Sequence, residues 1–444
     1  MNRLAALAGV LAMSLAQSAT ALTEDQAYQL GTEAYVYGIP LIEMARTRHR
    51  MTADPQNPSA FGLNTLVNVF RLAGPNSRGV VAPNVDTLYS VAWLDLRGEP
   101  VLLDVPDMAG RYYSFQFMDF FTNSFDYVGR RKTGTAEGRF VIVGPNFKGD
   151  LPAGAKIIRS PTPSVWLLGR TLIDGESDLV RLRPLMERYK LTTTGAPMTA
   201  PTLPQVDPAE PLSAFAVINA ALGENPPPAE DAALLARVAA IGVGPGQVFD
   251  PKTVEPAVAE ALRRAIRDAD RQYGTMTARQ GVTVDGWVRP AAELGLYGQN
   301  FRLRAVVAKT GLAANTLDES FYFSATADAS DQPLSGAHRY VLRFEAADIP
   351  PVNAFWSVTL YGPDRFLIAN PIKRYAIGDR TSGLKKGSDG AIEIYIQHEA
   401  PGGDKDANWL PAPAGSFALT LRAYEPKQAI MDGRYAPPPV HRAE

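Results

Sequence analysis

Apolar residues alternate with polar residues in two stretches of this 444-residue chain, and between these stretches they recur at about every 3.6 positions. A period of two is that of a strand with one buried face, and a period of 3.6 is that of an amphipathic helix. The β-rich runs of the first stretch are 88–94, 101–105, 112–118, 140–143, 156–160 and 165–171, and those of the second are 340–345, 354–361, 392–397 and 417–424. The pattern predicts two β-domains joined by a helical region.

The helical spacing predicts helices at 212–221, 229–240 and 256–273, and a helical stripe begins near Leu179. A further helical pattern covers 23–51, where Pro40 predicts a break into two short helices. We therefore expect a mainly β protein with a helical middle region. Its parts are N-terminal helices plus a β-sandwich at 22–175, the helical middle at 176–290 and a C-terminal β-domain at 291–444.

The first 21 residues have the pattern of a secretory signal peptide. Arg3 gives a positive start, residues 4–15 are apolar apart from one serine, and Ala19-Thr20-Ala21 offers a small-residue cleavage site. The apolar run is shorter than the roughly 20 residues that a membrane-spanning helix needs. Cleavage after Ala21 is therefore expected, leaving a periplasmic or secreted protein with no stable membrane insertion.

Charge and cysteine content exclude several classes of function. The formal net charge is −2 and the chain has no run of Lys or Arg, which argues against nucleic acid as a partner. The chain has no cysteine, so thiol catalysis, thiolate metal sites and disulfides are all ruled out.

Metal and cofactor motifs are also weak. The glycine-rich string at 241–246 follows a helical pattern, so it is read as a helix stop rather than a phosphate loop. The string at 404–408 begins like a calcium loop, but Trp409 stands where that loop needs glycine. The four histidines show no metal-ligand spacing, and the common serine and zinc hydrolase strings are missing. We expect no metal and no cofactor.

Polar and aromatic residues gather at 83–89 and again at 111–123. One interpretation is that the first group forms an Asx or ST turn that starts the strand at Leu88. The other is that Asp86, Tyr89, Arg111 and Tyr113 line a pocket in which an arginine and a carboxylate orient a polar ligand.

The same region resembles a known family. The strings PNVDTLYS (83–90) and VPDMAGRYYSFQFMDFFTNSF (105–125) are similar to the N-terminal domain of unknown function 1254. The strings FWSVTLYG (355–362), NPIKRYAIGDRT (370–381) and NWLPAPAGSFALTLRAYEP (408–426) are similar to its C-terminal companion, the domain of unknown function 1214. The resemblance implies an N-terminal β-sandwich, a helical middle segment and a C-terminal jelly-roll-like β-domain, and it implies no settled activity.

Three hypotheses of function are compatible with the sequence. The first is a periplasmic enzyme that acts on a small polar or aromatic molecule between the β-domains. Its lining candidates are Tyr89, Arg111, Tyr113, Asp119, Tyr361, Arg380 and Trp409. In this hypothesis Asp86 or Asp119 is the base, Arg111 and Arg380 hold an anion, and Tyr361 donates a hydrogen bond. The alternatives are a non-catalytic binding protein for a small molecule or carbohydrate, and a structural protein of the cell envelope.

Overall fold

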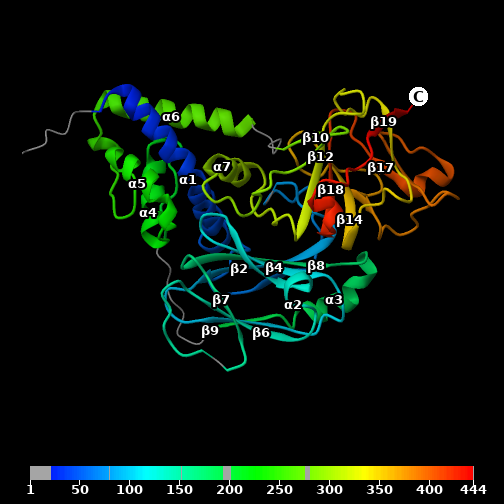
Figure 1. Cartoon of the computed structure of the whole chain (residues 1–444), viewed down its shortest axis with the longest axis horizontal. Coiled ribbons are helices and arrows are strands. Elements are labelled where there is room, and N and C mark those ends of the chain that lie inside the picture. The colour runs from blue at the N-terminus through cyan, green and yellow to red at the C-terminus, as the bar shows by residue number, and fades with distance from the viewer. Residues whose placement is uncertain (1–21, 80, 152, 194–201, 276–280, 444) are drawn as a thin grey trace, which may run out of the picture.

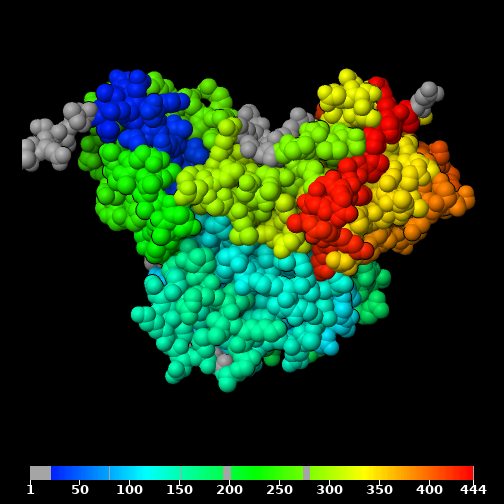
Figure 2. Space-filling model, in the orientation of Figure 1, coloured from blue at the N-terminus to red at the C-terminus, as the bar shows by residue number. Residues whose placement is uncertain are grey.

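The computed structural model describes residues 22–79, 81–151, 153–193, 202–275 and 281–443. Within them the chain is mainly β, as the sequence predicted, and its strands form two sandwich-like pairs of sheets. The first pair lies below and the second at the right in Figure 1, with the larger helices gathered at the upper left. The space-filling view shows the same three lobes in contact with one another (Figure 2).

The N-terminal sandwich packs a five-stranded sheet, in the order β1-β2-β8-β4-β5, onto a four-stranded sheet, in the order β7-β6-β3-β9. Its strands are β1 (Val67–Val69), β2 (Thr87–Asp95), β3 (Val101–Val105), β4 (Tyr113–Met118), β5 (Ser124–Gly129), β6 (Gly138–Val143), β7 (Lys156–Arg159), β8 (Ser164–Leu172) and β9 (Lys190–Thr193). Leu94, Leu103, Phe117 and Leu167 are fully buried in the core between the two sheets.

The C-terminal sandwich pairs a six-stranded sheet, in the order β10-β11-β12-β18-β14-β15, with a four-stranded sheet, in the order β17-β16-β13-β19. Its strands are β10 (Thr283–Val284), β11 (Trp287–Val288), β12 (Ser320–Ala325), β13 (Arg339–Phe344), β14 (Val352–Tyr361), β15 (Ala376–Gly378), β16 (Ile392–Gln397), β17 (Trp409–Pro411), β18 (Ala418–Pro426) and β19 (Val440–Ala443). The alternation expected at 392–397 is confirmed as far as Ile396, since Ile392, Ile394 and Ile396 are buried between the sheets while Glu393 and Tyr395 are half-buried. Gln397, expected on the wet face, is buried.

The helical part is built around one long N-terminal helix that packs against α4, α5, α6 and α7. The helices are α1 (Glu24–Thr52), α2 (Arg130–Thr133), α3 (Leu179–Met186), α4 (Ser213–Glu224), α5 (Ala232–Val238), α6 (Pro256–Thr275), α7 (Phe301–Thr310) and α8 (Gln428–Met431), with 3₁₀ turns η1 (Glu176–Asp178), η2 (Ala229–Asp231), η3 (Ala239–Ile241), η4 (Pro251–Thr253) and η5 (Gly403–Asn408). Among the helices in the described ranges, none is both long and apolar enough to cross a bilayer.

The predicted break at Pro40 is wrong, because α1 continues through this residue. A proline inside a helix removes one backbone hydrogen bond and costs about 3 kcal/mol. Here the residues from Ala34 to Leu41 are all buried against the other helices, and this packing offsets the cost. Thr23 caps the helix, since its side chain and that of Gln26 each accept a hydrogen bond from the other residue's backbone N–H.

The five-stranded sheet of the N-terminal sandwich is buried on both faces. One face carries Phe115 and Phe117 into the sandwich core. The opposite face holds Gln116, which is fully buried and donates from Nε2 to the Ala314 carbonyl beyond α7. Trp166 on the same sheet packs among the helices. This second face is where the three parts of the molecule meet.

Candidate functional site

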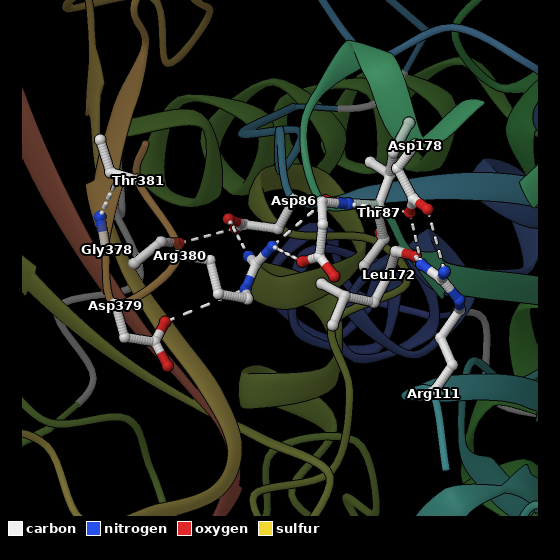
Figure 3. Close-up of polar contacts among 12 residues, drawn as sticks. Asp86, Thr87, Arg111, Leu172, Asp178, Gly378, Asp379, Arg380 and Thr381 are labelled. Atoms are coloured by element: carbon white, nitrogen blue, oxygen red, sulfur yellow. Dashed lines mark hydrogen bonds and ion pairs between the residues drawn. The ribbon is translucent and has the colours of Figure 1, made fainter. Parts of the chain in front are cut away.

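Asp86 and Arg380 lie together at the contact between the two sandwiches (Figure 3). Arg380 Nη2 donates to Asp86 Oδ1 at 3.0 Å, and the Ser357 hydroxyl donates to Asp86 Oδ2 at 2.7 Å. The Arg380 guanidinium also donates to the Ile173 carbonyl and lies 4.3 Å from the centre of the Phe355 ring. Both sequence candidates are therefore joined to each other, and they tie β14 and β15 of one sandwich to the ends of β2 and β8 of the other.

Arg111 makes a separate ion pair. Its guanidinium donates to both carboxylate oxygens of Asp178 and to the Leu172 carbonyl, and Figure 3 shows it directed toward these two residues. Burial acts to raise the pKa of Asp178, but the hydrogen bonds from Arg111 and from the Asp174 N–H, together with the charges of Arg111 and Arg181, hold the pKa below its usual value. Tyr113 is buried in the sandwich core and donates to the Gly134 carbonyl.

Asp119 and Trp409 have local structural contacts. The Asp119 carboxylate accepts hydrogen bonds from the backbone N–H groups of Phe121 and Asn123, so it holds the turn between β4 and β5. Burial raises the pKa of Asp119 to about 6, although these hydrogen bonds act in the opposite direction. Trp409 is buried beside β16, where its indole N–H donates to the Gln397 carbonyl.

A cavity of about 740 Å³ lies where the two sandwiches and α7 meet. It is bounded by the segment before β2, by β2 and β8 of the N-terminal sandwich, by β12 and β18 of the C-terminal sandwich, and by α7 with the residues that follow it. Tyr89 is the sequence candidate that lines this cavity. Tyr361 does not line the cavity, but its phenol donates at 2.7 Å to the carbonyl of Pro83, which does. The other candidates do not line it.

Two matching pairs of arginine and tyrosine contribute to the polar part of the cavity. In the N-terminal sheet, Arg170 of β8 is the register partner of Tyr89 in β2. In the C-terminal sheet, Arg422 of β18 is the register partner of Tyr322 in β12. In each pair the guanidinium carbon lies 5.9 Å from the centre of the tyrosine ring. All four side chains line the cavity, so each sandwich supplies one such pair of a cation and a phenol to it.

The proton of the Tyr89 phenol is free to be donated to a ligand. Asn84 Oδ1 accepts from the backbone N–H groups of Asp86 and Thr87 and from the Thr87 hydroxyl, which forms the Asx turn of the first interpretation given above. This fixes the amide, and Asn84 Nδ2 donates to the Tyr89 oxygen at 2.7 Å. Because Tyr89 accepts this bond, its own O–H remains available as a donor.

The Tyr322 phenol is held in the same way from the other side. Arg170 donates from Nη1 to Asn315 Oδ1 at 2.9 Å, which fixes the orientation of that amide. The Asn315 side-chain and backbone nitrogens then both donate to the Tyr322 oxygen at 3.1 Å. The Tyr322 oxygen therefore accepts two hydrogen bonds, and its proton is left to donate.

The charge of the cavity is not balanced by nearby carboxylates. The charged side chains lining it, within the described ranges, are Arg71, Arg78, Arg170, Arg365 and Arg422. Arg78 pairs with Asp364, whereas Arg170, Arg365 and Arg422 have no carboxylate partner in the described parts of the chain. Arg170 instead donates to Gln116 Oε1 and the Ala313 carbonyl, and Arg422 donates to Thr359 Oγ1 and the Ala82 carbonyl.

Arg365 adds a third guanidinium, and its Nη1 is buried without a hydrogen-bond partner. Burial lowers the pKa of Arg365, the Tyr361 phenol opposes this, and the nearby Arg422 guanidinium adds to the lowering. Burial and the neighbouring guanidinium of Arg422 therefore both disfavour the charge of Arg365, and an anion beside the two groups would offset this cost.

The backbone around the cavity is strained at three non-glycine residues. Ala82, Ala313 and Arg365 have φ angles of +49°, +68° and +63°. Arg422 holds the Ala82 carbonyl and Arg170 holds the Ala313 carbonyl, both at 2.7 Å, while the Ala82 N–H donates to the Arg365 carbonyl. Residues other than glycine rarely adopt this left-handed backbone conformation, and such strain is concentrated at functional sites.

The sequence interpretation missed both buried arginines of this cavity. Arg170 and Arg422 fall inside the predicted runs 165–171 and 417–424, which are otherwise mostly apolar. An arginine in the middle of an apolar strand is the local signal that could have identified them, because such a charge is rarely buried without a special role. Tyr89 was among the sequence candidates, but its pairing with Arg170, like that of Tyr322 with Arg422, depends on strand register, which has no local signal.

Comparison with known proteins gives the relatives of this chain but no activity. No curated protein matches it. The crystal structure of the VPA0106 protein from Vibrio parahaemolyticus is similar, with 26% identity and a TM-score of 0.72, covering 94% of this chain and 100% of that one. The crystal structure of an uncharacterized protein from Burkholderia cenocepacia is 14% identical with a TM-score of 0.45, covering 95% of each chain.

Two family descriptions match separate parts of the chain. Residues 63–193 match the family described as "Protein of unknown function (DUF1254)", and residues 319–428 match the one described as "Protein of unknown function (DUF1214)". These ranges contain Tyr89 and Arg170 in the first match and Tyr322, Arg365 and Arg422 in the second. The chain therefore belongs to the proteins that pair an N-terminal DUF1254 domain with a C-terminal DUF1214 domain, as the resemblance in its sequence indicated.

Proposed function

We propose that this protein binds a small, largely apolar molecule in the cavity between its two sandwiches. The observation that carries the proposal is a cavity of about 740 Å³ whose walls are mostly apolar and whose polar groups are few and held in place. Ligand-binding cavities in proteins have this size and composition. The strained residues at its edge support a functional cavity over a packing defect.

Binding without turnover fits the site better than catalysis. The expected bases Asp86 and Asp119 do not line the cavity, and each is engaged in other hydrogen bonds. Within the described residues the lining includes neither a carboxylate nor a histidine. Catalysis predicts that the bound molecule is chemically changed, whereas binding alone predicts that it is recovered unaltered after long incubation. Recovery of the ligand therefore distinguishes the two functions. A structural role in the envelope needs no such cavity.

An exported protein would meet its ligand outside the cytoplasm. The signal-peptide pattern of the first 21 residues supports this proposal. We expect protein purified from the periplasm or medium of an expressing bacterium to begin at Leu22, as measured by intact-mass spectrometry. A protein that accumulates only in the cytoplasm and starts at Met1 would contradict export.

The binding proposal is tested with a neutral apolar dye, N-phenyl-1-naphthylamine, whose fluorescence rises in an apolar site. We expect saturable binding to the wild-type protein. Ser324 of β12 is half-buried and lines the cavity, so Ser324→Trp fills part of the volume and should abolish binding of the dye. Ser330 lies in an exposed turn of the same sandwich, and Ser330→Trp is the matched control that should leave binding unchanged.

Two results would reject binding in this cavity. One is the absence of saturable dye binding to the folded wild-type protein. The other is equal dye affinity in the wild-type protein and a folded Ser324→Trp variant, because the bulky side chain occupies the proposed site.

A further inference from the structure

The tyrosine and arginine side chains that face the cavity are all hydrogen-bond donors. The inference drawn from this deepens the proposed function and rests on it. Tyr89 and Tyr322 each accept hydrogen bonds from protein groups and keep an O–H proton to donate. Arg170 and Arg422 can only donate, because a guanidinium has no acceptor. The two sandwiches thus present four hydrogen-bond donors to the cavity, and a matching ligand needs a group that accepts.

The charges point to an anion. Arg170 and Arg422 are 6% and 4% exposed, and their hydrogen-bond acceptors are neutral carbonyls, amides and a hydroxyl. A buried cation whose partners are all neutral keeps part of the cost of leaving water. An anion between the two guanidinium groups would recover that energy through charge-assisted hydrogen bonds. The buried and unpartnered Arg365 Nη1 adds a further donor beside them.

The N-terminal sheet also sets a direction for the rest of the ligand. Arg170, Leu168 and Trp166 lie at alternate positions of β8, so they share one face, and all three line the cavity. Their register partners in β2 are Tyr89, Val91 and Trp93. The surface therefore changes from a guanidinium and a phenol to aliphatic and then indole side chains over four residues, about 13 Å.

We propose that the ligand is an amphipathic carboxylate, with its head group held between the Arg170–Tyr89 and Arg422–Tyr322 pairs and its apolar tail along Leu168 and Trp166. A carboxylate has two oxygens, one for each sandwich. The further oxygens of a phosphate would need a donor outside the two pairs, such as Arg365, so a carboxylate is the anion that the two pairs match by themselves, and decyl phosphate tests the alternative. A medium-chain fatty acid or an aromatic acid has this combination of a small anion and an apolar body.

Competition with the neutral dye tests the head group separately from binding itself. Decanoate, decanol, decylamine and decyl phosphate share one tail and differ in the head group. We expect decanoate to displace the dye from the wild-type protein at concentrations about 10- to 100-fold lower than decanol, the range expected for charge-assisted hydrogen bonds. Decylamine should compete more weakly than decanol.

Variants assign the head group to the two pairs. Arg170→Met and Arg422→Met should each weaken decanoate binding by about 10- to 100-fold, and by a larger factor than they weaken binding of the dye measured on the same variant. Tyr89→Phe and Tyr322→Phe remove one O–H each and little else, so they should weaken decanoate by about 3- to 10-fold even if an arginine variant fails to fold. Arg434→Met, at an exposed arginine paired with Asp432, is the matched control and should change nothing.

The results that overturn this inference differ from those that reject the cavity. Dye binding that is lost in Ser324→Trp, combined with equal competition by decanoate and decanol, keeps the cavity and rejects the anion. Tighter binding of decyl phosphate than of decanoate rejects the carboxylate. Decanoate affinity unchanged in both tyrosine variants and in any folded arginine variant rejects the assigned position.

Discussion

The Asp86–Arg380 pair should govern stability rather than binding, and substitutions at the two positions should not be equivalent. The Asp86 carboxylate is 8% exposed and the Arg380 side chain is 22% exposed, so the pair is largely out of water. Arg380→Met leaves the Asp86 charge with the Ser357 hydroxyl as its remaining side-chain partner. In Asp86→Asn, by contrast, Arg380 keeps Asp174, the Ile173 carbonyl and the Phe355 ring.

These environments give different magnitudes for the change in the free energy of unfolding. A buried carboxylate deprived of its cation costs about 3 to 5 kcal/mol, which we expect for Arg380→Met. Loss of one charge-assisted hydrogen bond, with the remaining partners intact, costs about 1.5 to 3 kcal/mol, which we expect for Asp86→Asn. The double variant buries no unpaired charge. It should therefore cost about 2 kcal/mol less than the sum of the two single substitutions.

Urea unfolding at pH 7, followed by tryptophan fluorescence and by circular dichroism, measures all four proteins of this cycle. Dye and decanoate affinities are measured on the same samples below the unfolding transition, and both should equal the wild-type values. Additive effects within about 0.5 kcal/mol would refute the coupling between the two charges. A folded Asp86→Asn protein that loses decanoate affinity would instead place Asp86 in the binding site.

Three further substitutions test other parts of the structure. Because burial raises the pKa of Asp119 to about 6 from an ordinary value of 3.8, its carboxyl group favours folding at low pH. This contribution to the free energy of unfolding, on the order of 3 kcal/mol, is lost as pH rises from about 4 to 6. The difference in unfolding free energy between wild type and Asp119→Asn should therefore change over this window, and a difference independent of pH would contradict the assignment. Gly169→Ala should lower the free energy of unfolding by about 1 to 3 kcal/mol, since the new Cβ would lie 2.7 Å from the Phe115 side chain and 2.9 Å from that of Ser90. An unchanged midpoint of urea unfolding would show that these side chains move aside freely. Thr23→Ala removes the cap of α1 and should lower the unfolding free energy by about 1 kcal/mol, while no loss, measured in the same way, would mean that the first turn is dispensable.

The fold was largely predictable because its strands have alternating or continuous apolar runs. The predicted strands at 101–105 and 392–397 agree with β3 and β16 residue by residue. The single helix α1 was not predictable from local rules, since the packing that offsets the cost of Pro40 comes from helices far along the chain.

The candidate site was predicted only in part. The polar group at 83–89 does contain Tyr89 and the turn that orients it. Asp86, Arg111 and Arg380 were chosen as charged residues in polar segments, and such segments supply ion pairs as readily as ligand sites. The cavity arginines lie within apolar strands instead, and their tyrosine partners follow from the register of strands that are distant in sequence.

Alternate residues of strand β18 have two different roles, one in the core of the C-terminal sandwich and one in the lining of the cavity. Leu419, Leu421 and Ala423 are fully buried between the C-terminal sheets, while Thr420, Arg422 and Tyr424 line the cavity. A side chain on one face can therefore be exchanged without touching the packing on the other. Related proteins could diversify what they recognise at these three positions while keeping one sandwich, and the same positions offer a route to redesigned specificity.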